Sequence, residues 1–186
     1  MKPYLVSVIA AALAVVADAA TAAEAGDDAA VRNRIACYPF GIDKIGRGDL
    51  QAGTALWKEC LSPDFSFSAF IGRGEPTRCP GEQCPFPKDM SPIDMRAAFA
   101  KRAFDSAGFV KTSHHLTNVA VSFPTADKAV VNAYVQAWHW KQDNTVVIAP
   151  GTWDVELARV NDNWLITKEN LAIVGAAVVS PPPPPR

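Results

Sequence analysis

Three histidines are the side chains of this 186-residue chain best suited to acid–base chemistry: His114, His115 and His139. A neutral imidazole has an unperturbed pKa of about 6.5, so it can accept a proton near neutral pH. All three lie in segments whose alternation of side chains predicts β-strands. Each is therefore a candidate general base, and the strand faces decide which of them could line a pocket.

His139 ends the strand predicted over residues 129–141. Alternation places it on one face with Val131, Ala133, Val135 and Ala137, and gives the other face to Asn132, Tyr134, Gln136, Trp138 and Trp140. A row of small apolar residues favours the floor of a cavity, with His139 as a polar group at its end. The alternative is a core histidine bonded to a backbone carbonyl, and the residues alone leave both open.

The two adjacent histidines lie on the strand predicted over residues 110–123. His114 shares a face with Asn118, which could bond to substrate or to neighbouring backbone, and His115 belongs to the opposite face. Alternation alone does not show which of the two histidines faces a pocket.

Other side chains could contribute to a pocket. Glu169 falls among apolar neighbours on the strand predicted over residues 164–174, and is either a pocket acid or base or a surface carboxylate. Tyr38 could present its hydroxyl to a substrate oxygen or pack in the core. Trp138, Trp140 and Trp153 could stack on an aromatic ligand, pack on the sheet or form an oligomer interface.

The elements that position these side chains are helices followed by strands. Apolar residues spaced by three and four predict a helix over residues 29–46, kinked or broken at Pro39. Asp49 caps a second predicted helix that runs to about Cys60, and Ser91-Pro92 begins a third. The remaining strands are predicted over residues 65–70 and 145–160, the latter broken at Pro150-Gly151. This order predicts an α+β domain with helices on one face of a curved, mostly antiparallel sheet.

The composition excludes some partners. With 18 Lys and Arg against 19 Asp and Glu, the net charge is −1, which gives no basic surface for nucleic acid or an acidic membrane. No phosphate loop, dinucleotide fingerprint or metal-ligand spacing is present, so we expect no cofactor and no metal. The partner that fits is a small apolar or aromatic molecule.

The N-terminus predicts export. Residues 1–23 have the short apolar run and small-residue end of a signal peptide, so we expect a periplasmic or secreted protein with a domain over residues 24–176 and a proline-rich tail over 177–186. In an oxidising compartment, four cysteines indicate disulfides. Three pairings are possible, and we favour Cys37 with Cys60 and Cys79 with Cys84. The second bond would close part of the long loop over residues 71–92, which has the length of a functional lid.

Several motifs resemble the SnoaL-like branch of the nuclear transport factor 2-like superfamily, over about residues 31–174. They are Gly-Ile-Asp-Lys at 41–44, Gly-Asp-Leu at 48–50, Thr-Ser-His-His-Leu-Thr-Asn at 112–118 and Asn-Trp-Leu-Ile at 163–166. The resemblance implies a cone-shaped α+β barrel, with three N-terminal helices packed on the sheet. It also implies a homo-oligomer, a dimer or a trimer.

The resemblance implies a catalytic set as well. Position by position, the aspartate and histidine of scytalone dehydratase and hexachlorocyclohexane dehydrochlorinase become Asp43 and His114, and a second histidine becomes His139. Where the dehydrochlorinase has a lysine and an arginine, this chain has Tyr38 and Glu169, so chloride elimination is not implied. On an ideal helix Asp43 would lie roughly 120° from the apolar stripe. A kink at Pro39 is therefore needed to turn it inward.

The function that this set predicts is a cofactor-independent lyase. His114, assisted by Asp43, would remove a proton, and water or a small aldehyde would leave a small apolar, aromatic or cyclic substrate. Two alternatives stay open. One is an isomerase or polyketide-cyclase-like enzyme, and the other is a non-catalytic ligand-binding module.

Overall fold

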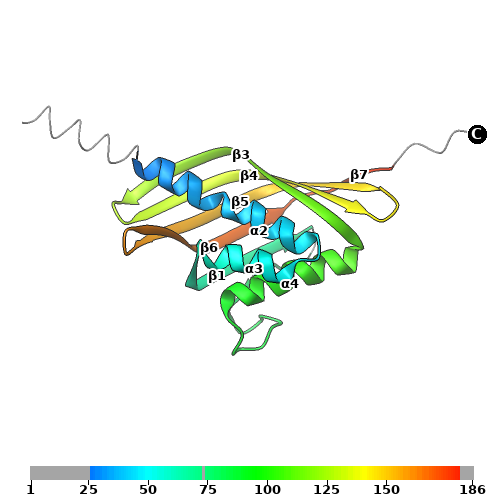
Figure 1. The fold of residues 1–186 in the computed structure, drawn as a ribbon, viewed down its shortest axis with the longest axis horizontal. Coiled ribbons are helices and arrows are strands. Elements are labelled where there is room, and N and C mark those ends of the chain that lie inside the picture. The colour runs from blue at the N-terminus through cyan, green and yellow to red at the C-terminus, as the bar shows by residue number, and fades with distance from the viewer. Residues whose placement is uncertain (1–25, 73, 181–186) are drawn as a thin grey trace, which may run out of the picture.

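The fold places a group of helices over one face of a curved sheet (Figure 1). The computed structural model describes residues 26–72 and 74–180. The predicted signal peptide and the last six residues of the predicted tail lie outside the described residues. Helical residues 26–35 come first, followed by α2 (Cys37–Gly46), α3 (Leu50–Lys58) and α4 (Pro92–Ala107). The α+β class and the position of the helices are confirmed.

The first predicted helix is two helices. The expected kink at Pro39 is instead a break at Ala36, where one helix ends and α2 begins. A proline ring clashes with the carbonyl four residues earlier, which here belongs to Ile35, so the helix cannot continue through that turn. Pro39 itself sits in the first turn of α2, where its missing N–H costs no hydrogen bond.

The predicted caps of the later helices are confirmed. The Asp49 carboxylate accepts a hydrogen bond from the backbone N–H of Ala52 at 3.0 Å, and the Ser91 hydroxyl accepts one from the N–H of Asp94 at 3.2 Å. Gly108 ends α4 with φ +70°, a left-handed conformation that favours glycine. These caps fix where each helix begins or ends relative to the sheet.

Within residues 26–72 and 74–180, seven strands form one mixed sheet. They are β1 (Leu61–Ile71), β2 (Thr77–Cys79), β3 (Phe109–Thr125), β4 (Lys128–Lys141), β5 (Val146–Val160), β6 (Asn163–Ile173) and β7 (Ala177–Val179). The order is β2-β1-β6-β5-β4-β3, with β7 paired to β5, and only the β1–β6 pair is parallel. The sheet is thus mostly antiparallel and open, with β2 and β3 at its edges, rather than a closed barrel.

Three local predictions differ from the structure. The strand over residues 146–160 is continuous, because Pro150 lies where β5 changes its neighbour on one side from β7 to β6. The long loop contains β2, which pairs with β1. Residues 177–179, assigned to the tail, form β7.

The cysteines pair as we favoured. Cys37 is bonded to Cys60, which ties the start of α2 to the chain just before β1. Cys79 is bonded to Cys84, which closes part of the loop between β2 and α4. In the described part of the chain, no helix has the length and apolar character needed to cross a membrane.

Candidate active site

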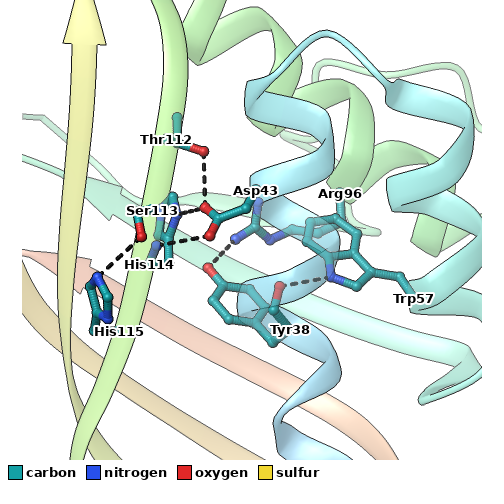
Figure 2. Close-up of polar contacts among 8 residues, drawn as sticks. All are labelled: Tyr38, Asp43, Trp57, Arg96, Thr112, Ser113, His114 and His115. Atoms are coloured by element: carbon teal, nitrogen blue, oxygen red, sulfur yellow. Dashed lines mark hydrogen bonds and ion pairs between the residues drawn. The ribbon is translucent and has the colours of Figure 1, made fainter.

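A close approach of α2 to β3 brings Asp43 against His114. A Cβ at Gly46 would overlap the side chain of Thr112, so only glycine allows this separation of the two elements. Asp43 on α2 turns toward β3 instead of solvent. Figure 2 shows Asp43 facing Thr112 and His114, while His115 lies on the other side of the strand.

Three donors hold the Asp43 carboxylate. Oδ2 accepts the backbone N–H of His114 at 3.1 Å, and Oδ1 lies 3.0 Å from the donating Thr112 hydroxyl. Oδ1 is also 2.8 Å from Nδ1 of the His114 ring. An ionised carboxylate can only accept, so Nδ1 carries the ring proton and Nε2 is left as a proton acceptor. The arrangement has the geometry of a carboxylate-oriented general base.

The second histidine lies beside this pair. The rings of His139 and His114 have centroids 5.4 Å apart and are nearly perpendicular, and His139 also stacks on Phe109 at 4.5 Å. Its Nδ1 is buried and has no hydrogen-bond partner among the described residues. Burial lowers the pKa of His139 to about 4, and the neighbouring His114 acts in the same direction. His139 is therefore neutral near pH 7.

A second polar cluster joins the predicted residues Tyr38 and Glu169 to Arg96, which was not predicted. Arg96 donates through Nε to Oε2 of Glu169 at 2.7 Å and through Nη2 to Oε1 at 2.8 Å, and Nη2 also donates to the Tyr38 hydroxyl at 2.9 Å. The indole N–H of Trp153 adds a bond to Glu169 at 3.1 Å. Glu169 is buried, so it is not a surface carboxylate, which was one of its two alternatives. Its partner Arg96 was not predicted. The available signal was a cation on the apolar stripe of α4, three residues from Ile93 and from Phe99.

Both clusters border one cavity of about 660 Å³. Its polar lining consists of Tyr38, Arg96, His114 and His139. The remaining walls are mostly apolar and include Ile42, Phe99, Phe104, Phe109, Val135, Ala137, Val147, Ala149, Leu171 and Ile173. The predicted row on β4 is thus buried and helps to line a cavity, with His139 at its end.

Three predicted substrate contacts do not line this cavity. Glu169 is buried, but its carboxylate is bonded to Arg96 and Trp153. Asn118 is exposed at a β-bulge, with φ +52° and a register shift between Thr117 and Ala120. The extra residue reverses the alternation, so the strand no longer keeps Asn118 on the face of His114. Trp138 lies on the opposite face of β4 from His139, as its alternation required, and that face is outside the cavity.

The third histidine lies outside this cavity as well. His115 is exposed, and its Nε2 lies 3.1 Å from the Ser113 hydroxyl. Within residues 26–72 and 74–180, no three side chains of the kinds that bind metals converge on one point.

Residues 23–170 match the family model of the SnoaL-like domain. The chain belongs to the SnoaL-like family. No curated protein sequence matches it.

Solved structures share the fold of this SnoaL-like chain. A scytalone dehydratase-like protein from Novosphingobium aromaticivorans is 16% identical, with a TM-score of 0.60 over 84% of this chain and 90% of that one. Hexachlorocyclohexane dehydrochlorinase LinA-type3 from Novosphingobium barchaimii is 15% identical, with a TM-score of 0.62 over 88% and 99%. A nuclear transport factor 2-like protein from Salmonella enterica is 17% identical, with a TM-score of 0.55 over 78% and 89%. At such identities the similarity establishes the fold alone.

Proposed function

We propose that the protein is a cofactor-independent lyase that removes water or a small aldehyde from a small, uncharged, aromatic or cyclic substrate. The observation that carries the proposal is His114 at the wall of an apolar cavity, with its ring bonded to Asp43. Membership of the SnoaL-like family, and structural neighbours that include a dehydratase-like protein and a dehydrochlorinase, support a lyase-type reaction.

The proton would move through His114. Its Nε2 removes a proton from a carbon or a hydroxyl of the substrate, and the electron pair of that bond forms a new double bond as the leaving group departs. The imidazolium that results is stabilised by Asp43. When a C–H proton is removed and hydroxide leaves, the same proton can pass to the hydroxide, so that water leaves and His114 is restored. When a hydroxyl proton is removed, the O–H electron pair forms the C=O bond of the aldehyde, the adjacent C–C bond breaks, and the carbon that keeps the electron pair of that bond takes the proton from His114.

His139 would have a different role from His114. A ring with a pKa of about 4 holds almost no proton to donate at pH 7, so it is a poor general acid. Its buried, unpartnered Nδ1 can bond to a substrate or leaving-group hydrogen or oxygen, depending on the tautomer. We therefore propose that His139 holds a substrate oxygen rather than donating a proton.

A substrate screen with three variants tests the proposal. Aryl-substituted hydroxyketones and diols are incubated with the protein, and product masses separate loss of water, loss of an aldehyde and isomerisation. His114→Ala and Asp43→Asn should each lower kcat/KM by about 10²- to 10⁴-fold, the range for a removed general base or its orienting carboxylate. His115→Ala is the matched control, because His115 is exposed on the other face of β3, and it should retain turnover. Full turnover by both site variants would refute the mechanism.

We also propose that the protein is exported from the cytosol. The resemblance to its family extends the proposal to a homo-oligomer. Two disulfides are typical of secreted and periplasmic proteins, because cytosolic thiols are kept reduced. Export agrees with the signal peptide expected over residues 1–23.

A further inference from the structure

A groove between the helices and β3 is separate from the apolar cavity. Its volume is about 650 Å³, and residues of the first two helices and of β3 line it. His114 lines both the groove and the cavity, whereas Asp43 lines the groove and not the cavity. The Asp43–His114 pair therefore stands between two spaces, and the proposed reaction uses only one of them.

Much of the groove wall is apolar. Ile35, Pro39 and Phe40 supply it from the helices, and Leu116 and Val119 supply it from β3. The side chain of Phe40 is 66% exposed. A ligand that covered this aromatic ring would remove apolar surface from water, which favours binding.

Four Asp, Lys and Arg side chains also line the groove. Arg32 forms an ion pair with Asp28 at 2.6 Å, and the Asp43 carboxylate already accepts three hydrogen bonds from β3. Lys44 and Arg47 are exposed, and neither has an acidic partner among the described residues. The groove thus holds two cations that are available to an anion.

The apolar and cationic parts of the groove follow one another along α2. Phe40, Lys44 and Arg47 are spaced by four and three residues, so they share one side of the helix. At about 1.5 Å per residue, Arg47 lies roughly 10 Å along the axis from Phe40. A molecule with an apolar chain and one anionic end matches this order, because its chain covers the wall while its charge meets the two cations.

We infer that the groove is a second ligand site, which binds a single-chain carboxylate such as a fatty acid. The carboxylate lies between Lys44 and Arg47, and the chain covers Phe40 and extends along the apolar wall toward Val119. The bound molecule lies on the groove side of the Asp43–His114 pair, outside the cavity of the proposed reaction. The inference goes beyond the proposed function and does not depend on it.

Three probes of equal chain length test the site: octanoate, octan-1-ol and octylamine. Calorimetric titration of the intact protein at low ionic strength measures their binding, and no turnover is involved. Octanoate should bind about 3- to 10-fold more tightly than octan-1-ol, the effect of two exposed cations, and octylamine should bind most weakly. Added salt should reduce the preference for octanoate, because it screens exposed charges.

The decisive variant is Lys44→Gln with Arg47→Gln. It should abolish the preference for octanoate and leave the affinity for octan-1-ol within about twofold, because the apolar wall is unchanged. The matched control is Arg78→Gln with Lys88→Gln, which removes two exposed cations in and after β2, at the opposite edge of the sheet from β3. The control has the same change in net charge and should keep the preference.

A further variant tests the apolar wall. Phe40→Ser removes an exposed ring, so the fold should be retained, and circular dichroism verifies this. It should weaken octanoate and octan-1-ol by the same factor, about 3- to 10-fold, and leave their ratio unchanged.

Four results would overturn the site. They are equal binding of octanoate and octan-1-ol, no binding of octanoate up to its solubility limit, a preference that survives in Lys44→Gln with Arg47→Gln, and an equal loss of the preference in the control. Cations at the end of α2 also stabilise the helix dipole. If that were their only role, the decisive variant would lower the melting temperature and keep the preference, so the affinity ratio separates the two roles.

Discussion

In and beside the cavity, polar side chains form two clusters that differ in whether they can accept and release a proton. Asp43 receives three hydrogen bonds from neighbouring residues of β3, and the ring of His114 is held with one nitrogen free. Arg96, Glu169 and Tyr38 are joined by hydrogen bonds. Burial raises the pKa of Tyr38; burial lowers the pKa of Arg96, but the Glu169 carboxylate and Tyr38 raise it by more. Only the first cluster is suited to moving a proton near neutral pH.

His139 should make folding stability depend on pH. Burial and the neighbouring His114 together lower its pKa to about 4, against the opposing influence of the Val147 backbone and Asp43, whereas the unfolded chain has a value near 6.5. Between those values the unfolded chain binds a proton that the folded protein rejects, so stability is full above about pH 7 and falls as the pH decreases toward 4. A shift of this size corresponds to about 3 kcal/mol.

Urea unfolding at about pH 7 and about pH 4.5 measures this effect. His139→Phe, which preserves an aromatic ring beside Phe109, should lose roughly 2 kcal/mol less than the natural chain on acidification. His115→Phe replaces an exposed ring and should show the full loss. Equal acid sensitivity of His139→Phe and the natural chain would show that His139 is not held neutral.

Among the elements, the contact of α2 with β3 determines the site. The absence of a side chain at Gly46 lets the helix approach Thr112. A larger residue at position 46 would hold Asp43 away from the backbone N–H and ring of His114. The catalytic proposal therefore rests on helix geometry as much as on the acidic residue.

Gly46→Ala tests that dependence. The added methyl group overlaps Thr112 and must displace α2, so the free energy of unfolding should fall by about 1–3 kcal/mol and turnover should fall with it. Gly26→Ala is the control, because nothing lies near that position, and helix propensity makes the change neutral or slightly stabilising. Thermal unfolding and kcat measure the two effects. A Gly46→Ala protein with unchanged stability and turnover would contradict the close-approach argument.

Across the whole molecule, two disulfides act on chain segments of different length. The Cys37–Cys60 bond spans 23 residues and lies next to Tyr38, whereas the Cys79–Cys84 bond spans five residues of the loop. Closing a longer loop removes more entropy from the unfolded chain. The first bond should therefore stabilise the fold more than the second.

Replacing Cys37 and Cys60 together by serine should cost about 3 kcal/mol, and replacing Cys79 and Cys84 about 2 kcal/mol, by the loop-length relation. Urea unfolding of both double variants, beside the reduced natural protein, measures the costs. A larger loss for the Cys79 and Cys84 variant would show that the loop is tied to the core by more than its own disulfide.

The sequence predicted the parts of this architecture that depend on local patterns. The alternation on β4, the caps at Asp49 and Ser91 and the pairing of the cysteines follow from spacing and compartment, and they are confirmed. The β-bulge at Asn118 could not be predicted, because the sequence pattern does not show that β3 has one more residue than β4 at this point. Arg96 was missed because its partner Glu169 lies 73 residues away, and only the fold joins them.

The most direct test of the central claim is the rate of proton removal with His114 replaced. Turnover of a substrate from the screen is measured for His114→Ala, with and without added imidazole, beside His115→Ala. The account predicts that His114→Ala loses about 10²- to 10⁴-fold in kcat, that imidazole restores part of the loss by entering the vacated space, and that His115→Ala is unaffected. Turnover by His114→Ala at the rate of the natural protein would contradict it.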